Sequence, residues 1–395
     1  MNNLNTGTFK GYFQLNIPIP ENLIDQLLTS VRQEDISAAQ AIKYIDRVLS
    51  TFRRIGLVGQ DDASVLRLLG NIGESYEVLG SLEKAHELYQ EALTIAIAQS
   101  DQGQCANLHW KIGRVYRKRN QWHDALEHIR QSRQLYEVAN ESKGIGRTWV
   151  SEGLVQANLG NYSEATHAYH SAIALAEQVQ EESIVSDASV NLGILASIQG
   201  DFEKAFLLYQ NSLPYYEQSQ KTISIARTYH NIGLTQSARR FWPEALDAFE
   251  KSVTIAQEKG DLILTALNYV HKAAVYLALN DRTLVATYCA RALDTFKEVD
   301  YPLGIAETYK VLGQLYTQKQ DWATAQGLLN ESLRLCQQYE KPLGIAEVNR
   351  EIGKLYHAQN KTEMARDALQ TAREQFLQLN AQHDATVTET LLETL

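Results

Sequence analysis

A period of 40 residues runs through most of this chain and constrains its fold more than any other feature. Small residues stand at one phase of the period: Gly73, Gly113, Gly153, Gly193, Gly233, Ala273, Gly313 and Gly353. Twelve positions later the residue is again small, as at Ala85 and Ala125, and sixteen positions later it is mostly bulky, as at Tyr89 and Ile129. The phase holds from 61 to 380 without insertion or deletion, which gives eight units of 40 residues. Such a repeat predicts one elongated array of similar units rather than several globular domains.

Within each unit the pattern of apolar residues is helical. In residues 82–97 apolar side chains recur at i, i+3, i+4 and i+7, which predicts one buried helix face. Short polar turns at 79–81, 159–161 and 199–201 contain a glycine, which can end a helix by adopting a positive φ. We therefore predict two antiparallel helices per unit. The small residues let the helices approach closely, and the bulky residue is expected to fill the gap between neighbouring pairs.

The two ends of the chain depart from the period, as the caps of a solenoid do. Residues 1–20 contain alternating apolar residues together with Pro18 and Pro20, which predicts an extended segment. This segment either packs along the first helices or lies in a groove. Residues 21–60 are predicted to form a degenerate helix pair, and residues 381–395 a C-terminal capping helix.

The phased positions resemble those of the tetratricopeptide repeat, whose small-residue positions match Gly73, Ala85 and Ala92. Its aromatic position in the first helix matches Tyr76 and Tyr116. The resemblance covers residues 61–380 and implies an all-α, right-handed superhelical solenoid. The period of 40 is similar to that of Pins/LGN-type adaptors and of bacterial regulators built from this repeat. Glu152 and Lys272 depart from the pattern, because they occupy an apolar position of the first helix.

Composition narrows the class of function. The net charge is 37 − 47 = −10, which disfavours non-specific binding to nucleic acid or to membrane surfaces. The first twenty residues lack the charge and apolar core of a secretory signal, so we expect a cytoplasmic protein. The three cysteines are far apart in the sequence, which argues against a disulfide scaffold and a cysteine zinc site.

No motif for catalysis stands out. The chain lacks GxSxG, a P-loop, a GxGxxG opening a strand–helix unit, and HExxH, so we predict that it is not an enzyme and uses no cofactor. His167 and His170 are spaced i, i+3, but two ligands without a carboxylate are too few for a metal site. We therefore predict no bound metal.

The resemblance implies that first helices line a concave surface where ligands bind. At the inner phases, the second unit carries a basic stripe of Lys111, Arg114, Arg117 and Lys118, beside Trp110. Arginine forks suit carboxylates and phosphates. A solvated charged helix face is the alternative interpretation. The candidate partner-binding residues of the whole chain are Arg67, Asn71, Trp110, Lys111, Arg114, Arg117, Lys118, Arg147, Asn191, His230, Asn231, His271, Lys310, Arg350 and Lys354.

These candidates differ in character along the array. Asn71, Asn191 and Asn231 share one phase, and an asparagine can hold the backbone of an extended peptide. His230 and His271 would make binding sensitive to pH. A second basic patch is predicted at the far end, at Lys310, Arg350 and Lys354.

We therefore predict a scaffold or adaptor that binds another protein or peptide in its concave groove. The partner segment is expected to be extended or helical and partly acidic, and self-association is possible. One alternative is a bacterial regulator that senses a peptide and changes its superhelical pitch. Another is a regulatory module for a separate effector chain.

Overall fold

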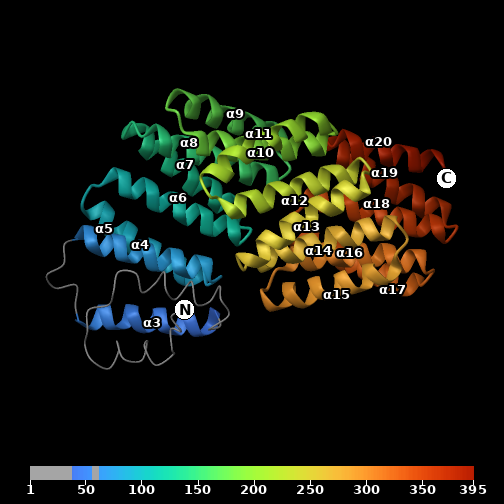
Figure 1. Cartoon of the computed structure of the whole chain (residues 1–395), viewed down its shortest axis with the longest axis horizontal. Coiled ribbons are helices and arrows are strands. Elements are labelled where there is room, and N and C mark those ends of the chain that lie inside the picture. Colours follow the sequence, from blue (N-terminus) through green and yellow to red (C-terminus); the bar gives the residue numbers. More distant parts are fainter. Residues whose placement is uncertain (1–37, 56–61) are drawn as a thin grey trace. The chain divides into compact units, whose positions relative to one another are not determined.

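The computed structural model describes residues 38–55 and 62–395, which form helices joined by short turns (Figure 1). The predicted all-α solenoid of helix pairs is confirmed for these residues. The predicted segment 1–20 lies outside the described residues, as does most of the predicted pair at 21–60. The helices divide into two compact units, with the boundary in the sequence between Asn140 and Glu141.

Unit 1 contains five described helices, and most of them have the same length. They are α3 (Ala38–Ile55), α4 (Asp62–Val78), α5 (Leu82–Ala98), α6 (Gln102–Lys118) and α7 (Trp122–Val138).

Unit 2 continues the same pattern and ends on a shorter helix within the range predicted for the C-terminal cap. Its helices are α8 (Ser142–Asn158), α9 (Tyr162–Gln178), α10 (Glu182–Gln199), α11 (Phe202–Gln218), α12 (Thr222–Ala238), α13 (Trp242–Glu258), α14 (Leu262–Ala278), α15 (Arg282–Glu298), α16 (Pro302–Gln318), α17 (Trp322–Gln338), α18 (Pro342–Ala358), α19 (Thr362–Gln378) and α20 (Gln382–Glu393).

Turns between helices repeat one backbone conformation every 20 residues. Gly80, Gly160 and Gly200 have φ of 78°, 82° and 90°, as predicted for glycines that end a first helix. Most of the other turns reach the same region with a residue that has a side chain, for example Asn120 at 58°. Asparagine tolerates this region better than most residues, so a turn of this kind forms even where glycine is absent.

The recurring glycines are explained by the contact between the two helices of a pair. A Cβ atom built on Gly73 would lie 2.5 Å from a ring carbon of Tyr89, which is too close for any real side chain. Gly233 has the same relation to Phe249. This bulky residue therefore packs against the glycine of its own pair, and the expectation that it fills only the space between pairs was incomplete.

The one exception to the glycine phase follows the same rule. Ala273 replaces glycine, and the bulky residue opposite it in the sequence pattern is replaced by Cys289. Both side chains are fully buried in one apolar cluster. The extra methyl group on α14 is thus matched by a smaller side chain on α15, because a close-packed interior conserves volume.

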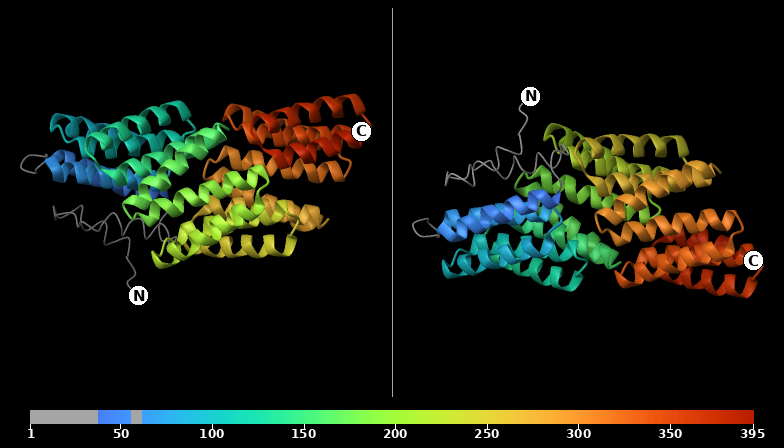
Figure 2. Two further views of the ribbon diagram at one scale, coloured as in Figure 1. Left: turned by 90° about the horizontal axis from the view of Figure 1, so that it is seen from above. Right: turned by 90° about the horizontal axis from the view of Figure 1, so that it is seen from below.

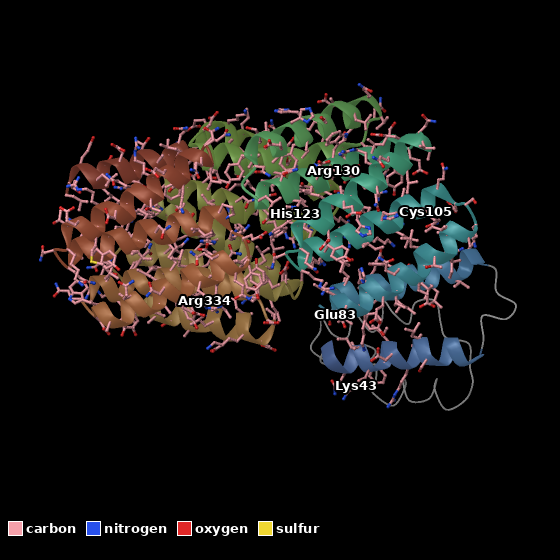
Figure 3. All side chains as sticks on the ribbon, turned by 180° about the vertical axis from the view of Figure 1, so that it is seen from behind. Lys43, Glu83, Cys105, His123, Arg130 and Arg334 are labelled. Carbon is pink, nitrogen blue, oxygen red and sulfur yellow. The ribbon has the colours of Figure 1, made fainter. Side chains whose placement is uncertain are left out.

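First helices of successive pairs contact one another in unit 2: α8 with α10, α10 with α12, α12 with α14, α14 with α16, and α16 with α18. They therefore lie on the inner side of the curve that the pairs describe. Second helices carry exposed charges on their outer surface, among them Arg130 on α7 and Arg334 on α17 (Figure 3). We call the exposed faces of the first helices the inner face of each unit.

The last helices of unit 2 pack against its first ones. Leu379, at the end of α19, lies against Gly160, in the turn between α8 and α9. The rings of Phe202, at the start of α11, and His383, at the start of α20, have centroids 5.0 Å apart. Figures 1 and 2 show α20 beside α10 within this unit. We call this the closure contact.

An apolar cluster and a polar pair support the closure contact. Tyr162, at the start of α9, shares one buried cluster with Phe376 and Leu379 of the far end. Nearby, Lys341 donates a hydrogen bond from Nζ to Oδ1 of Asn158, 183 positions earlier. The curvature of unit 2 therefore brings its two ends together.

Candidate functional site

A pocket of about 260 Å³ opens between the inner faces of α4 and α6 in unit 1. Helix α4 contributes Arg67 and Asn71 to it, and α6 contributes Lys111, which are three of the predicted partner-binding residues. Two further carboxamides from α6, of Gln104 and Asn107, complete its polar lining. The remaining lining residues are Ala63, Leu66, Gly70 and Leu108.

Much of the predicted basic stripe on α6 is paired with carboxylates of α4. The Nζ atom of Lys111 lies 2.9 Å from Oε1 of Glu74. Arg114 lies 2.8 Å from Glu77, and Lys118 lies 3.0 Å from the same carboxylate. These three cations therefore hold α6 against α4, which leaves less positive charge for a partner than the sequence pattern indicates.

Glu77 is the centre of this arrangement. Its side chain is buried, and the hydroxyl of Tyr89 donates a hydrogen bond to it at 3.2 Å. Burial by itself would raise the pKa of Glu77, but Arg114 and Lys118 hold the pKa of this carboxyl below its usual value. Glu77 is consequently an ionised, buried group that is compensated by two cations.

The remaining residues of the stripe lie beside these pairs. The guanidinium of Arg114 stacks over the ring of Trp110, 4.6 Å from its centroid. Both Trp110 and Arg117 are half-buried. Trp110 therefore shields one side of the Arg114–Glu77 pair from water.

A cluster of three histidines lies elsewhere in unit 1, and sequence analysis did not predict it. The Nδ1 atoms of His109 and His128 are 3.0 Å apart, and Tyr116 stacks on His128 with centroids 5.3 Å apart. His86 meets the other side of Tyr116. Burial, together with His128, lowers the pKa of His109 to about 4. Burial likewise lowers the pKa of His86 and of His128.

In the first part of unit 2 the candidates are mostly engaged within the fold. Asn191 donates a hydrogen bond to the backbone carbonyl of Asp187 at 2.7 Å. His230 is 9% exposed, and its Nδ1 lies 3.0 Å from Oδ1 of Asn268. Arg147 and Asn231 are half-buried.

His230 and His271 form a contact, as their adjacent phases predict. Their ring centroids are 5.1 Å apart. Burial lowers the pKa of His230 to about 4, and it also lowers the pKa of His271. Both rings are consequently neutral at physiological pH, so their contribution to binding a partner would be through hydrogen bonds rather than charge.

The predicted second basic patch is also paired. Lys310 contacts Glu347 of the next first helix and lies 2.8 Å from Glu307. Arg350 contacts Asp384 of α20. Lys354 lies 2.8 Å from Oε1 of the buried Glu351.

Sequence analysis missed the carboxylates that compensate these cations. The missed residues are Glu74, Glu77, Glu307, Glu347, Glu351 and Asp384. The signal was present, because Glu74 and Glu77 stand at inner phases and Glu347 has the phase of Arg67. Comparing the acidic and basic residues at each inner phase would have predicted the pairs.

Other classes of site find little support in residues 38–55 and 62–395. In this part of the chain, no group of three or more histidine, cysteine or acidic side chains is placed to hold a metal ion. Within the same ranges, every helix is too short or too polar to cross a bilayer.

Comparison with known proteins agrees with this architecture. Inner and outer helices alternating at a fixed period define a helical-repeat protein. Residues 64–138 and 304–378 match the tetratricopeptide repeat family, and these two regions belong to it. The family predicted from the sequence is thereby confirmed, and no curated protein matches the chain in a sequence search.

Solved structures of bacterial regulators share the fold. One is the Rap conjugation gene regulator of the plasmid pLS20 in complex with the Phr* peptide, with a TM-score of 0.59 and 14% identity, covering 82% of this chain and 97% of that one. NprR in complex with its cognate peptide NprX has a TM-score of 0.55 and 14% identity, covering 87% and 100%. Aspartyl phosphate phosphatase F from Bacillus subtilis has a TM-score of 0.54 and 12% identity, covering 93% and 97%.

Proposed function

We propose that this chain is a non-enzymatic peptide-binding protein, either an adaptor or a sensor. It holds an extended segment of a partner against the inner face of its first helices. Two solved structures with the same fold contain a bound peptide, which supports a peptide as the class of ligand. A shared fold leaves the identity of the peptide open, because specificity resides in the side chains of the site.

One observation carries the proposal: the pocket between α4 and α6. Its lining combines carboxamides with two cations and apolar side chains, and it opens on the inner face where the candidate residues were predicted. Carboxamides both donate and accept hydrogen bonds, so they can pair with a peptide backbone whatever its sequence. A pocket of about 260 Å³ suits part of a peptide rather than a folded surface.

The partner is expected to carry limited acidic character. Three cations of the stripe and three of the far patch are already paired within the fold, so a long acidic segment would compete with existing carboxylates. The three cysteines are free and buried, which is consistent with the reducing cytoplasm as the proposed setting.

Selection from a random peptide library displayed on phage tests this function. The full chain is immobilised, and enriched peptides are synthesised and titrated against it in solution. We expect saturable binding that a variant with Asn71→Ala and Asn107→Ala weakens. Enrichment of no peptide that binds in solution would contradict the proposal.

A second candidate is a sensor whose superhelix changes when the peptide binds. The closure contact favours it, because the end of the repeat array then has two distinct arrangements available, packed against α8–α11 or released. Small-angle scattering of the full chain with and without a selected peptide distinguishes the two functions. An adaptor gives superimposable curves, and a sensor gives a changed radius of gyration.

A further inference from the structure

The pocket in unit 1 exists because of one glycine. At the phase of Gly70 every other repeat has a larger side chain: Trp110, Val150, Val190, His230, Val270, Lys310 or Arg350. Gly70 lines the pocket, so a side chain at this position would project into it. The opening is therefore specific to the first repeat at this phase.

Helix packing does not require the glycine at position 70. A Cβ atom built on Gly70 would meet only Nζ of Lys111, at an ordinary contact distance of 3.4 Å. At Gly73, one position of the glycine phase, the same atom would collide with Tyr89 at 2.5 Å. Because glycine in the middle of a helix costs stability, an unneeded glycine indicates that the space itself is used. That space holds the ammonium group of Lys111 and leaves the pocket open.

Charge gives the chemistry of the occupant. The lining contains two cations, Arg67 and Lys111, and no carboxylate. Glu74 outside the lining compensates Lys111, so the local sum is 2 − 1 = +1. Arg67 is exposed and forms no ion pair with any residue of the described part of the chain. A single excess positive charge matches a carboxylate, whereas a phosphate group carries nearly two negative charges.

We propose that this pocket binds a carboxylate of the peptide ligand, with Arg67 as its principal contact. The guanidinium presents parallel N–H donors to the two carboxylate oxygens, Lys111 adds a further donor, and Asn71 and Asn107 hold the adjoining peptide groups. The proposal rests on the proposed peptide-binding function and assigns one anionic subsite within it. The carboxylate comes from a peptide C-terminus or from an acidic side chain.

Three small probes separate these sources. N-acetylalanine carries a terminal carboxylate, the α-amide of N-acetylglutamic acid carries only a side-chain carboxylate, and N-acetylalaninamide carries none. Each is titrated into the full chain while the NMR signals of the side-chain amides of Asn71, Gln104 and Asn107 are followed. We expect one or both carboxylates to shift these signals to saturation and the neutral probe to leave them unchanged.

Two variants test the assignment of the residues. Arg67→Gln should weaken carboxylate binding about tenfold or more, because it removes a charge-assisted contact. Gly70→Val should abolish binding by filling the pocket while it keeps every polar group. Gly327→Val is the matched control, since Gly327 is a helical glycine on α17 with open space around it. It should bind like the wild type, and circular dichroism verifies that each variant is folded.

The outcomes separate this proposal from the proposed function. If library peptides bind the wild type and Gly70→Val equally, and no carboxylate probe shifts the amides, peptide binding stands and the subsite is wrong. If the neutral probe binds as well as the carboxylates, or Arg67→Gln has no effect, the anionic assignment is wrong. If no peptide binds at all while the carboxylate probes do, the subsite stands and the peptide function is wrong.

Discussion

Glu77 on α4 and Arg114 on α6 form an ion pair with an Oε2–Nη2 distance of 2.8 Å. The carboxylate is buried, whereas the guanidinium is 28% exposed. Because 37 positions separate these two residues, the pair joins the first helices of successive repeats. An arginine that the sequence assigns to a partner is thus also a structural residue of unit 1.

Glu77→Gln should destabilise the contact between α4 and α6 by about 1–3 kcal/mol, because it leaves Arg114 and Lys118 without their charge partner. The measurement is hydrogen exchange of the backbone amides of the two helices. Glu83→Gln is the control, since Glu83 (Figure 3) is exposed and its pair with Arg119 is long, at 3.7 Å. This control should change stability by less than about 0.5 kcal/mol. Equal effects of the two substitutions would contradict the structural role of Glu77.

Acidification should weaken unit 1 through His109 and His128. The pKa of His109 is lowered from 6.5 to about 4, so the folded state favours the neutral ring. Stability from this group is complete above about pH 6.5 and is lost as the pH falls towards 4. Because both rings are only partly buried, we expect a loss on the order of 1 kcal/mol, measured from hydrogen exchange of α6 and α7 corrected for intrinsic rates.

A substitution tests the source of this pH dependence. His128→Tyr should reduce it, because Tyr288 stands at the same phase in another repeat and stacks on Tyr276 as His128 stacks on Tyr116. His123→Gln is the control, since His123 is exposed on α7 (Figure 3). An unchanged pH profile in His128→Tyr would show that another group titrates.

Glycine-to-alanine substitutions should have opposite effects at two helical positions. Gly233→Ala should destabilise by about 1–3 kcal/mol, because its methyl group would lie 2.5 Å from the ring of Phe249. Gly327→Ala should stabilise by up to about 1 kcal/mol, since it gains helix propensity and meets no atom within 4 Å. Urea unfolding followed by circular dichroism measures both. Stabilisation by both substitutions would contradict the packing role of the glycine phase.

The closure contact makes a matched pair of turn glycines informative. Gly160 and Gly80 have similar positive φ values, of 82° and 78°, but only Gly160 has neighbours, with Leu379 at 2.5 Å from an added Cβ. Alanine should strain both turns by about 1–2 kcal/mol. Gly160→Ala should cost about 1–3 kcal/mol more and should expose α19 to hydrogen exchange. If the two variants were equally stable, the closure contact would contribute nothing to the stability of unit 2.

The sequence by itself determined the repeat unit. The phases of Gly73 and Tyr89 predicted two closely packed helices, and the contact between these residues spans only 16 positions. Gly80 likewise predicted a turn with positive φ. Such features depend on neighbours within one period, so a single period contains enough information to specify them.

Only the tertiary structure decided which charges remain for a partner and where the array ends up in space. Pairing of Glu77 with Arg114 depends on how one repeat is rotated on the next. Contact between Asn158 and Lys341 depends on that rotation accumulated over several repeats. A small rotation per repeat arises from the packing of whole interfaces, and no single phase of the sequence encodes it. Phase analysis therefore located the inner face, whereas its free cation, its pocket and the closure contact emerged from the folded array.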